Sequence, residues 1–244
     1  MGALACWSTT ATDPQNAGEA QAAILPRSRA STADGARPGA VYSHGATDKA
    51  RWVAKHPAAW VAAGQGYPVL SRDFSGDHWG NDTAIARMDQ AAAYMTGTFG
   101  AKVGKLVLVA HSMGGCHLLN WATRNPSQVA AVILSCPVLD LKNMHDANVS
   151  GYAASIETAY GGLAGYQAAA TAHNPMDFAG TLAALPIRVY YSTNDPVCTP
   201  AQVSSFAGAA GSLCSSYSMS ASGHTQEVVP PADVLSWMQA QGLA

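Results

Sequence analysis

Short apolar runs recur along the chain and alternate with segments of helical character. Five runs have the length of one buried strand, and a weaker sixth run follows near the carboxyl end: 40–44, 67–71, 105–110, 129–134, 187–192 and 215–219. Capping residues and apolar positions that fit one buried face predict helices between and after these runs: 51–63, 82–98, 113–124 and 231–239. Apolar strands that alternate with helices are typical of a parallel sheet covered on both faces, so the predicted fold class is α/β.

Two segments interrupt this alternation. Residues 1–38 are rich in Ala, Ser, Thr and Pro and show no firm periodicity, although edge strands could be hidden there. Residues 138–180 hold several Tyr, Met and Gly residues, and a loop of this length is unusual in a compact domain unless it forms a cap or lid. We therefore predict a single domain over residues 1–244 with a small cap insertion at 138–180. An ordinary pair of surface helices is the alternative for the insertion.

Composition narrows the class of protein. Charged residues make up 11% and hydrophobic residues 48% of the 244 residues, which excludes an intrinsically disordered chain. The formal net charge of −2 gives no general attraction for nucleic acid or anionic lipid, so we predict no nucleic-acid partner. No apolar run approaches the roughly 20 residues of a membrane-spanning helix, so no transmembrane segment is predicted.

The amino-terminal sequence MGALACWSTT bears on the location of the protein. It lacks the basic region and the long apolar stretch of a secretory signal peptide. We therefore expect a cytoplasmic protein, unless a signal has already been removed. The sequence leaves the oligomeric state open.

Cysteine and histidine residues are scattered rather than clustered. The five cysteines show no C-x-x-C spacing and predict neither a zinc site nor a disulfide framework: Cys6, Cys116, Cys136, Cys198 and Cys214. The eight histidines are equally dispersed, so we predict no metal and no cofactor. Cys198 and Cys214 look like a natural pair, but a predicted crossover helix would hold them beyond the roughly 7 Å reach of a disulfide.

The run LVLVAHSMGG at residues 106–115 carries the strongest candidate chemistry. Ser112 lies where a buried strand passes directly into a helix, which places it on a sharp and strained turn. Such a turn needs small residues two positions before and after the serine, and Ala110 and Gly114 occupy these positions. The usual pattern is Gly-x-Ser-x-Gly, so Ala110 departs from it by one methyl group. We interpret Ser112 as a nucleophile, with a structural turn serine as the alternative.

This strand, serine and helix resemble the nucleophile elbow of the α/β-hydrolase family, in which the acid and then the histidine follow the serine along the chain. Asp195, just after the strand 187–192, begins a stretch that is similar to the family's Asp-x-x-x-x-Pro loop. The resemblance implies that Asp195 is the acid of a catalytic triad. Asp140 is the main competitor, because some relatives carry the acid after the preceding strand.

The histidine of the triad is expected in a loop before the last helix. Gly223-His224 lies there, and His224 is the only histidine after Asp195. The resemblance therefore implies that His224 is the general base, held in the correct tautomer by Asp195. A solvated loop histidine is the alternative.

An oxyanion hole is the third part that the resemblance implies. One donor would be the backbone N–H of Met113, immediately after the nucleophile. The other would come from the turn at 43–46, which resembles the family's His-Gly loop, with Ala46 as the donor and Gly45 as the alternative. Gly45, His111 and Trp79 are the candidates for contact with the substrate, although His111 and Trp79 could equally pack around the site.

The combined pattern predicts a serine carboxylic-ester hydrolase of the esterase or lipase type. It would form a covalent acyl-enzyme and cleave small to medium apolar acyl esters or lipid esters. The same triad could instead serve amide, thioester, acyl-transfer or perhydrolase chemistry, because the fold does not fix the reaction. The turn at 79–82 is similar to short hydrolases of actinobacteria and their phages, which leaves open a virion-associated location. A non-catalytic virion or binding protein that retains the fold is the third hypothesis.

Overall fold

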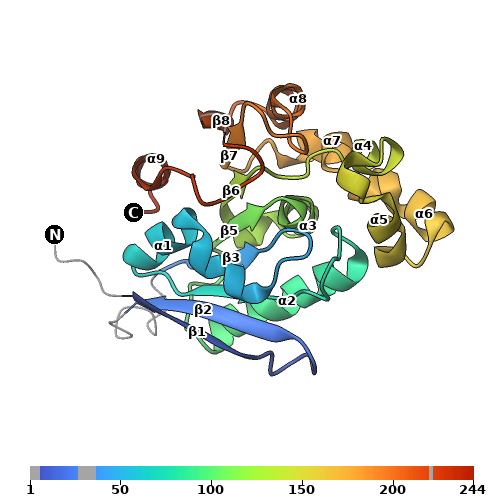
Figure 1. Ribbon diagram of the computed structural model, residues 1–244. Coiled ribbons are helices and arrows are strands. Elements are labelled where there is room, and N and C mark those ends of the chain that lie inside the picture. Colours follow the sequence, from blue (N-terminus) through green and yellow to red (C-terminus); the bar gives the residue numbers. More distant parts are fainter. Residues whose placement is uncertain (1–5, 27–36, 220–221) are drawn as a thin grey trace.

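The computed structural model describes residues 6–26, 37–219 and 222–244, with side chains from residue 10 onward in the first range. Its centre is an eight-stranded sheet in the order β1-β2-β4-β3-β5-β6-β7-β8 (Figure 1). Six of these strands run parallel to one another: β3 (Gly39–Ser43), β4 (Val69–Arg72), β5 (Leu106–His111), β6 (Val129–Ser135), β7 (Ile187–Ser192) and β8 (Cys214–Met219). The predicted α/β fold with a mostly parallel sheet is confirmed.

A hairpin extends the sheet at the β4 edge. Strand β1 (Cys6–Thr12) pairs antiparallel with β2 (Ala20–Pro26), and β2 pairs antiparallel with β4. Both strands lie within residues 1–38, where the sequence showed no periodicity but left room for edge strands. Arg72 at the end of β4 is buried, and its Nε lies 3.4 Å from Asp13 Oδ2 in the hairpin turn. This ion pair ties the hairpin to the parallel part of the sheet.

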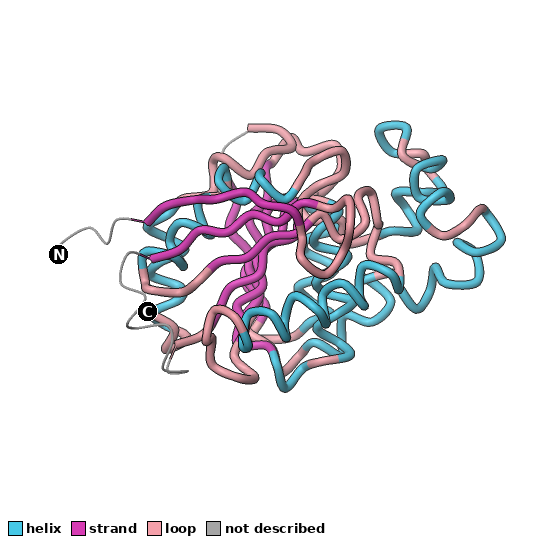
Figure 2. The backbone as a smooth tube through the Cα atoms, turned by 90° about the horizontal axis from the view of Figure 1, so that it is seen from below, coloured by secondary structure: helices cyan, strands magenta, loops and turns pink. Residues whose placement is uncertain are grey.

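Helices cover both faces of the sheet (Figures 1 and 2). Helices α1 (Pro57–Gly64) and α9 (Pro231–Ala240) contact each other on one face. The other face is covered by α2 (Asp82–Gly97), α3 (Met113–Arg124) and α8 (Pro200–Ala210). The apolar strands are therefore buried on both sides, as their sequences predict.

The single helix predicted over 51–63 is wrong in one respect, because the chain breaks there into two shorter helices. A 3-10 helix, η2 (Ala50–Lys55), precedes α1, and Pro57 is the first residue of α1. Proline has no N–H to donate to the preceding turn, so it begins a helix more readily than it continues one. The His56 side chain caps α1 by accepting the Ala58 N–H at 3.2 Å.

The chain between β6 and β7 forms a group of short helices that project from one side of the molecule, at the right in Figures 1 and 2. The helices of this segment are α4 (Leu141–Asp146), η4 (Val149–Gly151), α5 (Ala153–Ala159), α6 (Leu163–His173), α7 (Pro175–Phe178) and η5 (Ala179–Leu182). Their apolar side chains, such as Met144, Ile156 and Tyr166, form a second hydrophobic cluster with Trp79 and Met113 of the body. The position fits the expected cap insertion, and its role as a cap stays a prediction.

Two further expectations concern cysteines and membranes. Cys198 and Cys214 carry free thiols and are separated along the chain by α8. Within the described ranges, no helix combines the length and the apolar character that crossing a membrane requires.

Candidate active site

Ser112 lies on the turn between β5 and α3 in a backbone conformation that L-residues rarely adopt. Its φ is 52° and its ψ is −122°. Two backbone hydrogen bonds hold the turn: the Ser112 N–H donates to the carbonyl of Ser135 at 3.1 Å, and its carbonyl accepts the Val138 N–H at 2.9 Å. Strain of this kind persists only where the surrounding structure fixes it, and it clusters at functional sites.

Close packing around the turn explains the small residues beside Ser112. A Cβ atom at Gly114 would lie 2.2 Å from the carbonyl oxygen of Ser43, and one at Gly115 would lie 2.5 Å from the Cβ of Pro137. The first contact is with backbone, and the second is with the rigid ring of a proline, so neither could be relieved by turning a flexible side chain. Ala110 is fully buried in β5, so one methyl group fits where the common pattern has glycine.

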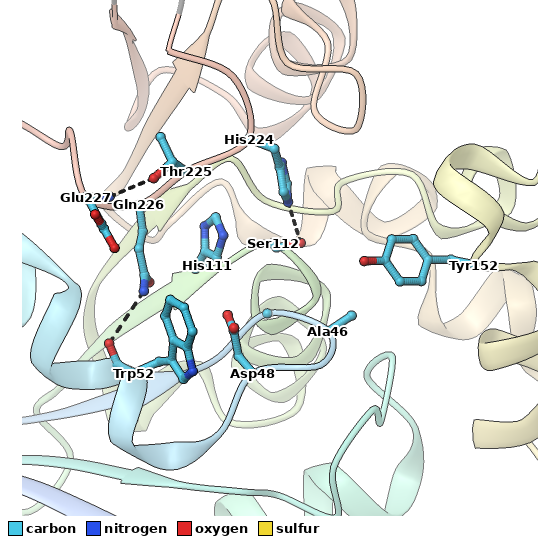
Figure 3. Close-up of a pocket in the computed structure, with 11 residues that line it drawn as sticks. Ala46, Asp48, Trp52, His111, Ser112, Tyr152, His224, Thr225, Gln226 and Glu227 are labelled. Carbon is cyan, nitrogen blue, oxygen red and sulfur yellow. Dashed lines mark hydrogen bonds between the residues drawn. The ribbon is translucent and has the colours of Figure 1, made fainter.

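The structure brings Ser112, His224 and Asp195 into one hydrogen-bonded chain. His224 Nε2 lies 2.8 Å from Ser112 Oγ (Figure 3), and His224 Nδ1 lies 2.9 Å and 3.0 Å from the two carboxylate oxygens of Asp195. The three residues follow β5, β7 and β8, whose carboxyl ends meet at one edge of the parallel sheet. With its proton on Nδ1, the imidazole donates to Asp195 and offers the Nε2 lone pair to the serine hydroxyl.

The Asp195 carboxylate is buried and held by several donors. Its Oδ1 accepts the backbone N–H groups of Val197 at 2.7 Å and Cys198 at 3.0 Å. Burial alone would raise the pKa of Asp195, but the hydrogen bond and charge of His224 and the backbone donor at Cys198 outweigh it, and the pKa is lowered. The group is therefore ionised at neutral pH.

Asp140, the competing acid, has a different place. It is the N-cap of α4 and accepts the Asn143 N–H at 3.1 Å. The Asp140 side chain makes no hydrogen bond to His224 within the described part of the chain, whereas that of Asp195 does. The geometry therefore favours Asp195 as the partner of the histidine.

The candidate oxyanion loop follows β3 and lies against the serine turn. A Cβ on Gly45 would meet Asp48 Oδ2 at 3.0 Å and Ser112 Cβ at 3.3 Å, so the loop backbone approaches Ser112 closely. The buried His44 ring lies 2.8 Å from the Gly45 carbonyl and 3.0 Å from the Asp73 carbonyl, which fixes the loop. Ala46, on this loop, lines the same pocket as Ser112.

Ser112 lines a pocket of about 230 Å³ (Figure 3). Its walls come from the oxyanion loop, from η2, from the segment between β6 and β7, and from the loop that carries His224: Gly45, Ala46, Asp48, Trp52, His111, Ser112, Tyr152, His224, Thr225, Gln226 and Glu227. Several of these lining residues were not predicted from the sequence, because they belong to no recognisable motif: Asp48, Trp52, Tyr152 and Gln226.

Charge is unevenly distributed around this pocket. Burial raises the pKa of the half-buried Asp48 carboxyl group, against the opposing charges of His44, Lys55 and His224. Lys55 Nζ is already paired with the exposed Glu227 at 3.2 Å and lies 4.0 Å from the Trp52 ring centre. Trp52 lies on the same side of the pocket as Asp48 and Glu227, whereas Tyr152 lies on the opposite side, with its hydroxyl pointing toward Ser112 (Figure 3).

The remaining candidates for substrate contact lie at different depths. Gly45 and His111 line the pocket, and the His111 ring packs 5.0 Å from that of His224. Burial and the neighbouring His224 lower the pKa of His111 to about 3, so it stays neutral. Trp79 is fully buried one layer behind, where it packs against Tyr152 and its indole N–H donates to Ser155. It shapes the wall of the pocket rather than its interior.

Among the described residues, a single group of three possible metal ligands lies close together. Cys136, Asp195 and His224 each offer one ligand atom, and these atoms lie within 4.8 Å of one another. The group overlaps the hydrogen-bonded chain described above.

Comparison with known families decides the class of the protein. Residues 36–160, which are 125 of the 244 residues, match the family described as "Serine aminopeptidase, S33". The chain belongs to this family. It is therefore a serine hydrolase of the α/β-hydrolase type, in agreement with the resemblance found in the sequence. The matched range contains Ser112 but ends before Asp195 and His224.

Solved structures agree with this family in their fold. A fluorophosphonate-binding serine hydrolase of Staphylococcus aureus has a TM-score of 0.73 at 14% identity, and the match covers 97% of this chain and 98% of that one. An esterase of Pyrococcus furiosus has a TM-score of 0.67 at 14% identity over 97% and 93% of the two chains. An S-formylglutathione hydrolase of Agrobacterium tumefaciens has a TM-score of 0.66 at 13% identity over 98% and 94%. A search of curated protein sequences finds no match.

Proposed function

We propose that this serine hydrolase cleaves carboxylic esters through a triad of Ser112, His224 and Asp195. The observation that carries the proposal is the hydrogen-bonded chain of these three side chains, with distances of 2.8 Å and 2.9 Å, at the base of an open pocket. A nucleophile within hydrogen-bond reach of a base that is oriented by a third group is the arrangement that nucleophilic catalysis requires.

The first half of the proposed reaction forms an acyl-enzyme. His224 Nε2 takes the proton of the Ser112 hydroxyl as Oγ attacks the ester carbonyl carbon. The ionised Asp195 stabilises the imidazolium that results, without taking its proton. His224 then gives the proton to the leaving alcohol as the tetrahedral intermediate collapses.

Two backbone donors would stabilise the negative charge that develops on the carbonyl oxygen. The Met113 N–H begins α3, and the Ala46 N–H belongs to the loop that the close approach of Gly45 holds against the serine turn. Loss of one such donor costs on the order of 10²–10³ in rate in related chemistry. In the second half of the reaction, water activated by His224 cleaves the acyl-enzyme and releases the acid.

The proposed substrates are esters of small to medium acyl groups. The pocket volume of about 230 Å³ lies below the roughly 300–1,000 Å³ of sites for drug-sized ligands, which favours a short acyl chain. A lipid ester is the larger alternative, in which the chain would extend past Tyr152 along the segment between β6 and β7. A series of p-nitrophenyl esters of increasing chain length separates the two, because kcat/KM should be highest for short chains if the pocket holds the whole acyl group.

Labelling with a fluorophosphonate tests the nucleophile independently of the substrate. We expect one covalent adduct on Ser112, with no labelling of Ser112→Ala and undiminished labelling of Ser127→Ala, a variant at an exposed serine in the 3-10 helix at Pro126–Gln128. Labelling of Ser112→Ala at the wild-type rate would contradict the assignment.

Amide or peptide hydrolysis is the second candidate, and the description of the matched family favours it. The same triad would form the same acyl-enzyme, and His224 would protonate a leaving amine instead of an alcohol. Parallel assays with aminoacyl p-nitroanilides and p-nitrophenyl esters distinguish the two. A higher kcat/KM for the anilides would replace the ester proposal with this one.

A further inference from the structure

A buried thiol lies directly behind the triad and takes no part in the proposed mechanism. Cys136 follows β6, next to the turn that carries Ser112, and its φ of 44° is fixed in the left-handed region. Its side chain is fully buried, and its Sγ lies 3.6 Å from the carbonyl oxygen of Thr225, the residue after His224. The thiol therefore touches the loop that positions the proposed base.

This thiol is not a nucleophile. Burial, reinforced by the charge of Asp195, raises the pKa of Cys136 to about 12, so the thiolate is scarce at neutral pH. The environment instead places a sulfur atom, a carboxylate and an imidazole nitrogen within 4.8 Å of one another. Sulfur, nitrogen and carboxylate oxygen are the three ligand types of zinc sites in proteins.

We propose that Cys136, Asp195 and His224 form an inhibitory site for a soft divalent cation such as Zn²⁺. The ion would be bound by Cys136 Sγ, one carboxylate oxygen of Asp195 and Nδ1 of His224. The inhibition rests on the proposed triad, but the binding of the ion does not.

The geometry requires only small movements. Tetrahedral zinc with Zn–S of about 2.3 Å and Zn–N and Zn–O of about 2.0–2.2 Å separates neighbouring ligand atoms by roughly 3.3–3.6 Å. His224 Nδ1 and Asp195 Oδ2 are 2.9 Å apart and must open slightly, whereas Sγ must approach by at most about 1.2 Å. The carbonyl oxygen of Thr225, already close to Sγ, or a water molecule can complete the coordination.

The charges around the site favour a cation. Asp195 is ionised, and within the described part of the chain its ion pair is with His224 rather than with lysine or arginine. The His224 side chain is a quarter exposed and lines the pocket, so the site lies directly behind a ring that reaches solvent. Mg²⁺ and Ca²⁺ prefer sites made of oxygen ligands, so they should not compete.

The protonation state of His224 explains why such an ion would inhibit the enzyme. In the free enzyme the proton of neutral His224 is on Nδ1, which donates to Asp195, and Nε2 accepts from Ser112. When the ion takes the Nδ1 lone pair, that proton moves to Nε2, and the Cys136 thiol releases one proton to solvent as it becomes a thiolate. An Nε2 that carries a proton cannot accept the hydroxyl proton of Ser112. The wrong histidine tautomer costs about 10⁴ in kcat in a comparable triad.

Cadmium tests binding without any assay of activity. Cd²⁺ titrated into the Ser112→Ala protein should produce the ultraviolet charge-transfer band of a cadmium thiolate at one equivalent. Cys136→Ala in the same background should remove the band. Cys214→Ala, a control variant at the free thiol that begins β8, should keep it. A band that survives Cys136→Ala, or no band in Ser112→Ala, overturns the proposed site.

Zinc tests the inhibition in the active enzyme, with each variant normalised to its own rate without metal. Zn²⁺ should inhibit ester hydrolysis, a chelator should restore it, and Mg²⁺ should have no effect. Cys136→Ala should raise the inhibition constant at least ~10-fold, since even outer-shell partners of metal sites are worth 10–100-fold in affinity. Equal inhibition of Cys136→Ala and wild type overturns the proposal. An enzyme that binds Cd²⁺ through Cys136 but cleaves no ester would contradict the proposed function and leave the ion site intact.

Discussion

At the scale of single residues, Ser112 combines a strained backbone with a hydrogen bond to His224, and its removal is the most direct test of the proposed nucleophile. Ser112→Ala deletes one oxygen and leaves the turn, which backbone hydrogen bonds to Ser135 and Val138 hold. We expect ester turnover to fall by at least ~10⁴-fold, as for other members of such triads, while the thermal midpoint stays nearly unchanged. Activity assays and thermal melts of the two purified proteins check this. Retention of a tenth of the activity would exclude Ser112 as the nucleophile.

Substitution of the two candidate acids should affect the activity very differently. Asp195→Asn keeps the shape of the side chain but turns an acceptor into a donor toward His224 Nδ1, which favours the wrong tautomer. We expect a loss of about 10⁴ in kcat, as in a comparable triad. Asp140→Asn keeps a capping side chain on α4 and should retain most of the activity. Kinetics of both variants decide between them, and a larger loss in Asp140→Asn would move the acid to the loop after β6.

The residues that belong to motifs could be predicted from the sequence, whereas the other residues of the pocket could not. Ser112, Asp195 and His224 each occupy a fixed place after a strand, so a family pattern of strand, loop and chain order identifies them. Asp48 and Tyr152 reach the same pocket only because η2 and the segment between β6 and β7 fold toward it. Their positions depend on tertiary packing, which no local pattern encodes.

At the scale of elements, the contact between α3 and β3 holds the turn of Ser112 against the proposed oxyanion loop. A Cβ at Gly114 would lie 2.2 Å from the Ser43 carbonyl oxygen and 2.9 Å from that of His44, and both are backbone atoms. Gly114→Ala must therefore separate the helix from the strand, and we expect it to lower the free energy of unfolding by about 1–3 kcal/mol. It should also lower kcat, because Ala46 would move away from Ser112.

Gly208 in α8 supplies the matched control for this prediction. No atom lies within 4 Å of a Cβ built there, so Gly208→Ala should stabilise the protein by about 0.4–1 kcal/mol through its helix propensity. Denaturant unfolding and kinetics of both variants provide the comparison. Wild-type activity in Gly114→Ala would show that the close approach of α3 and β3 is not needed for catalysis.

The elements that the sequence predicted well are those with continuous apolar runs. Strand β5 and the helix α3 that follows it lie within a residue or two of their predicted bounds, because a strand buried on both faces must be apolar throughout. The hairpin of β1 and β2 was missed as a defined element, since an edge hairpin rich in Ala, Ser and Thr carries little contrast between its faces. The break at Pro57 was also missed, although proline at the start of a helix is its signal.

At the scale of the whole molecule, several histidines are buried and neutral. Burial is the main cause that lowers the pKa of His56, His111 and His117 to about 3 each, against about 6.5 in an unfolded chain. Their rings are satisfied by neutral partners, such as Ser135 Oγ, which lies 2.9 Å from His56 Nε2. In acid, these histidines therefore bind protons in the unfolded chain at pH values at which they stay neutral in the folded chain.

This difference between the folded and unfolded pKa values predicts that the protein loses stability steeply as the pH falls. Because the folded pKa values are depressed, the contribution of these histidines to stability is full above about pH 6.5 and is lost as the pH falls from there toward about 3. Each buried histidine adds up to about 1.4 kcal/mol per pH unit to the slope in this window. The thermal midpoint should therefore fall steeply between about pH 6.5 and pH 4.

Two histidine variants test the sign of the effect. His56→Gln removes one histidine that binds a proton in the unfolded chain but not in the folded chain. The thermal midpoint should therefore depend less steeply on pH, whatever stability the substitution costs at neutral pH. His145 provides the opposite case: burial lowers its pKa, but the hydrogen bonds and charges of Asp146 and Glu157 outweigh this and raise it. Its stabilising effect is present in acid and is lost as the pH rises through its folded pKa, so His145→Gln should leave the slope in acid as steep as in the wild type or steeper. A flatter slope in His145→Gln, or an unchanged one in His56→Gln, would assign the acid instability to groups other than the buried histidines.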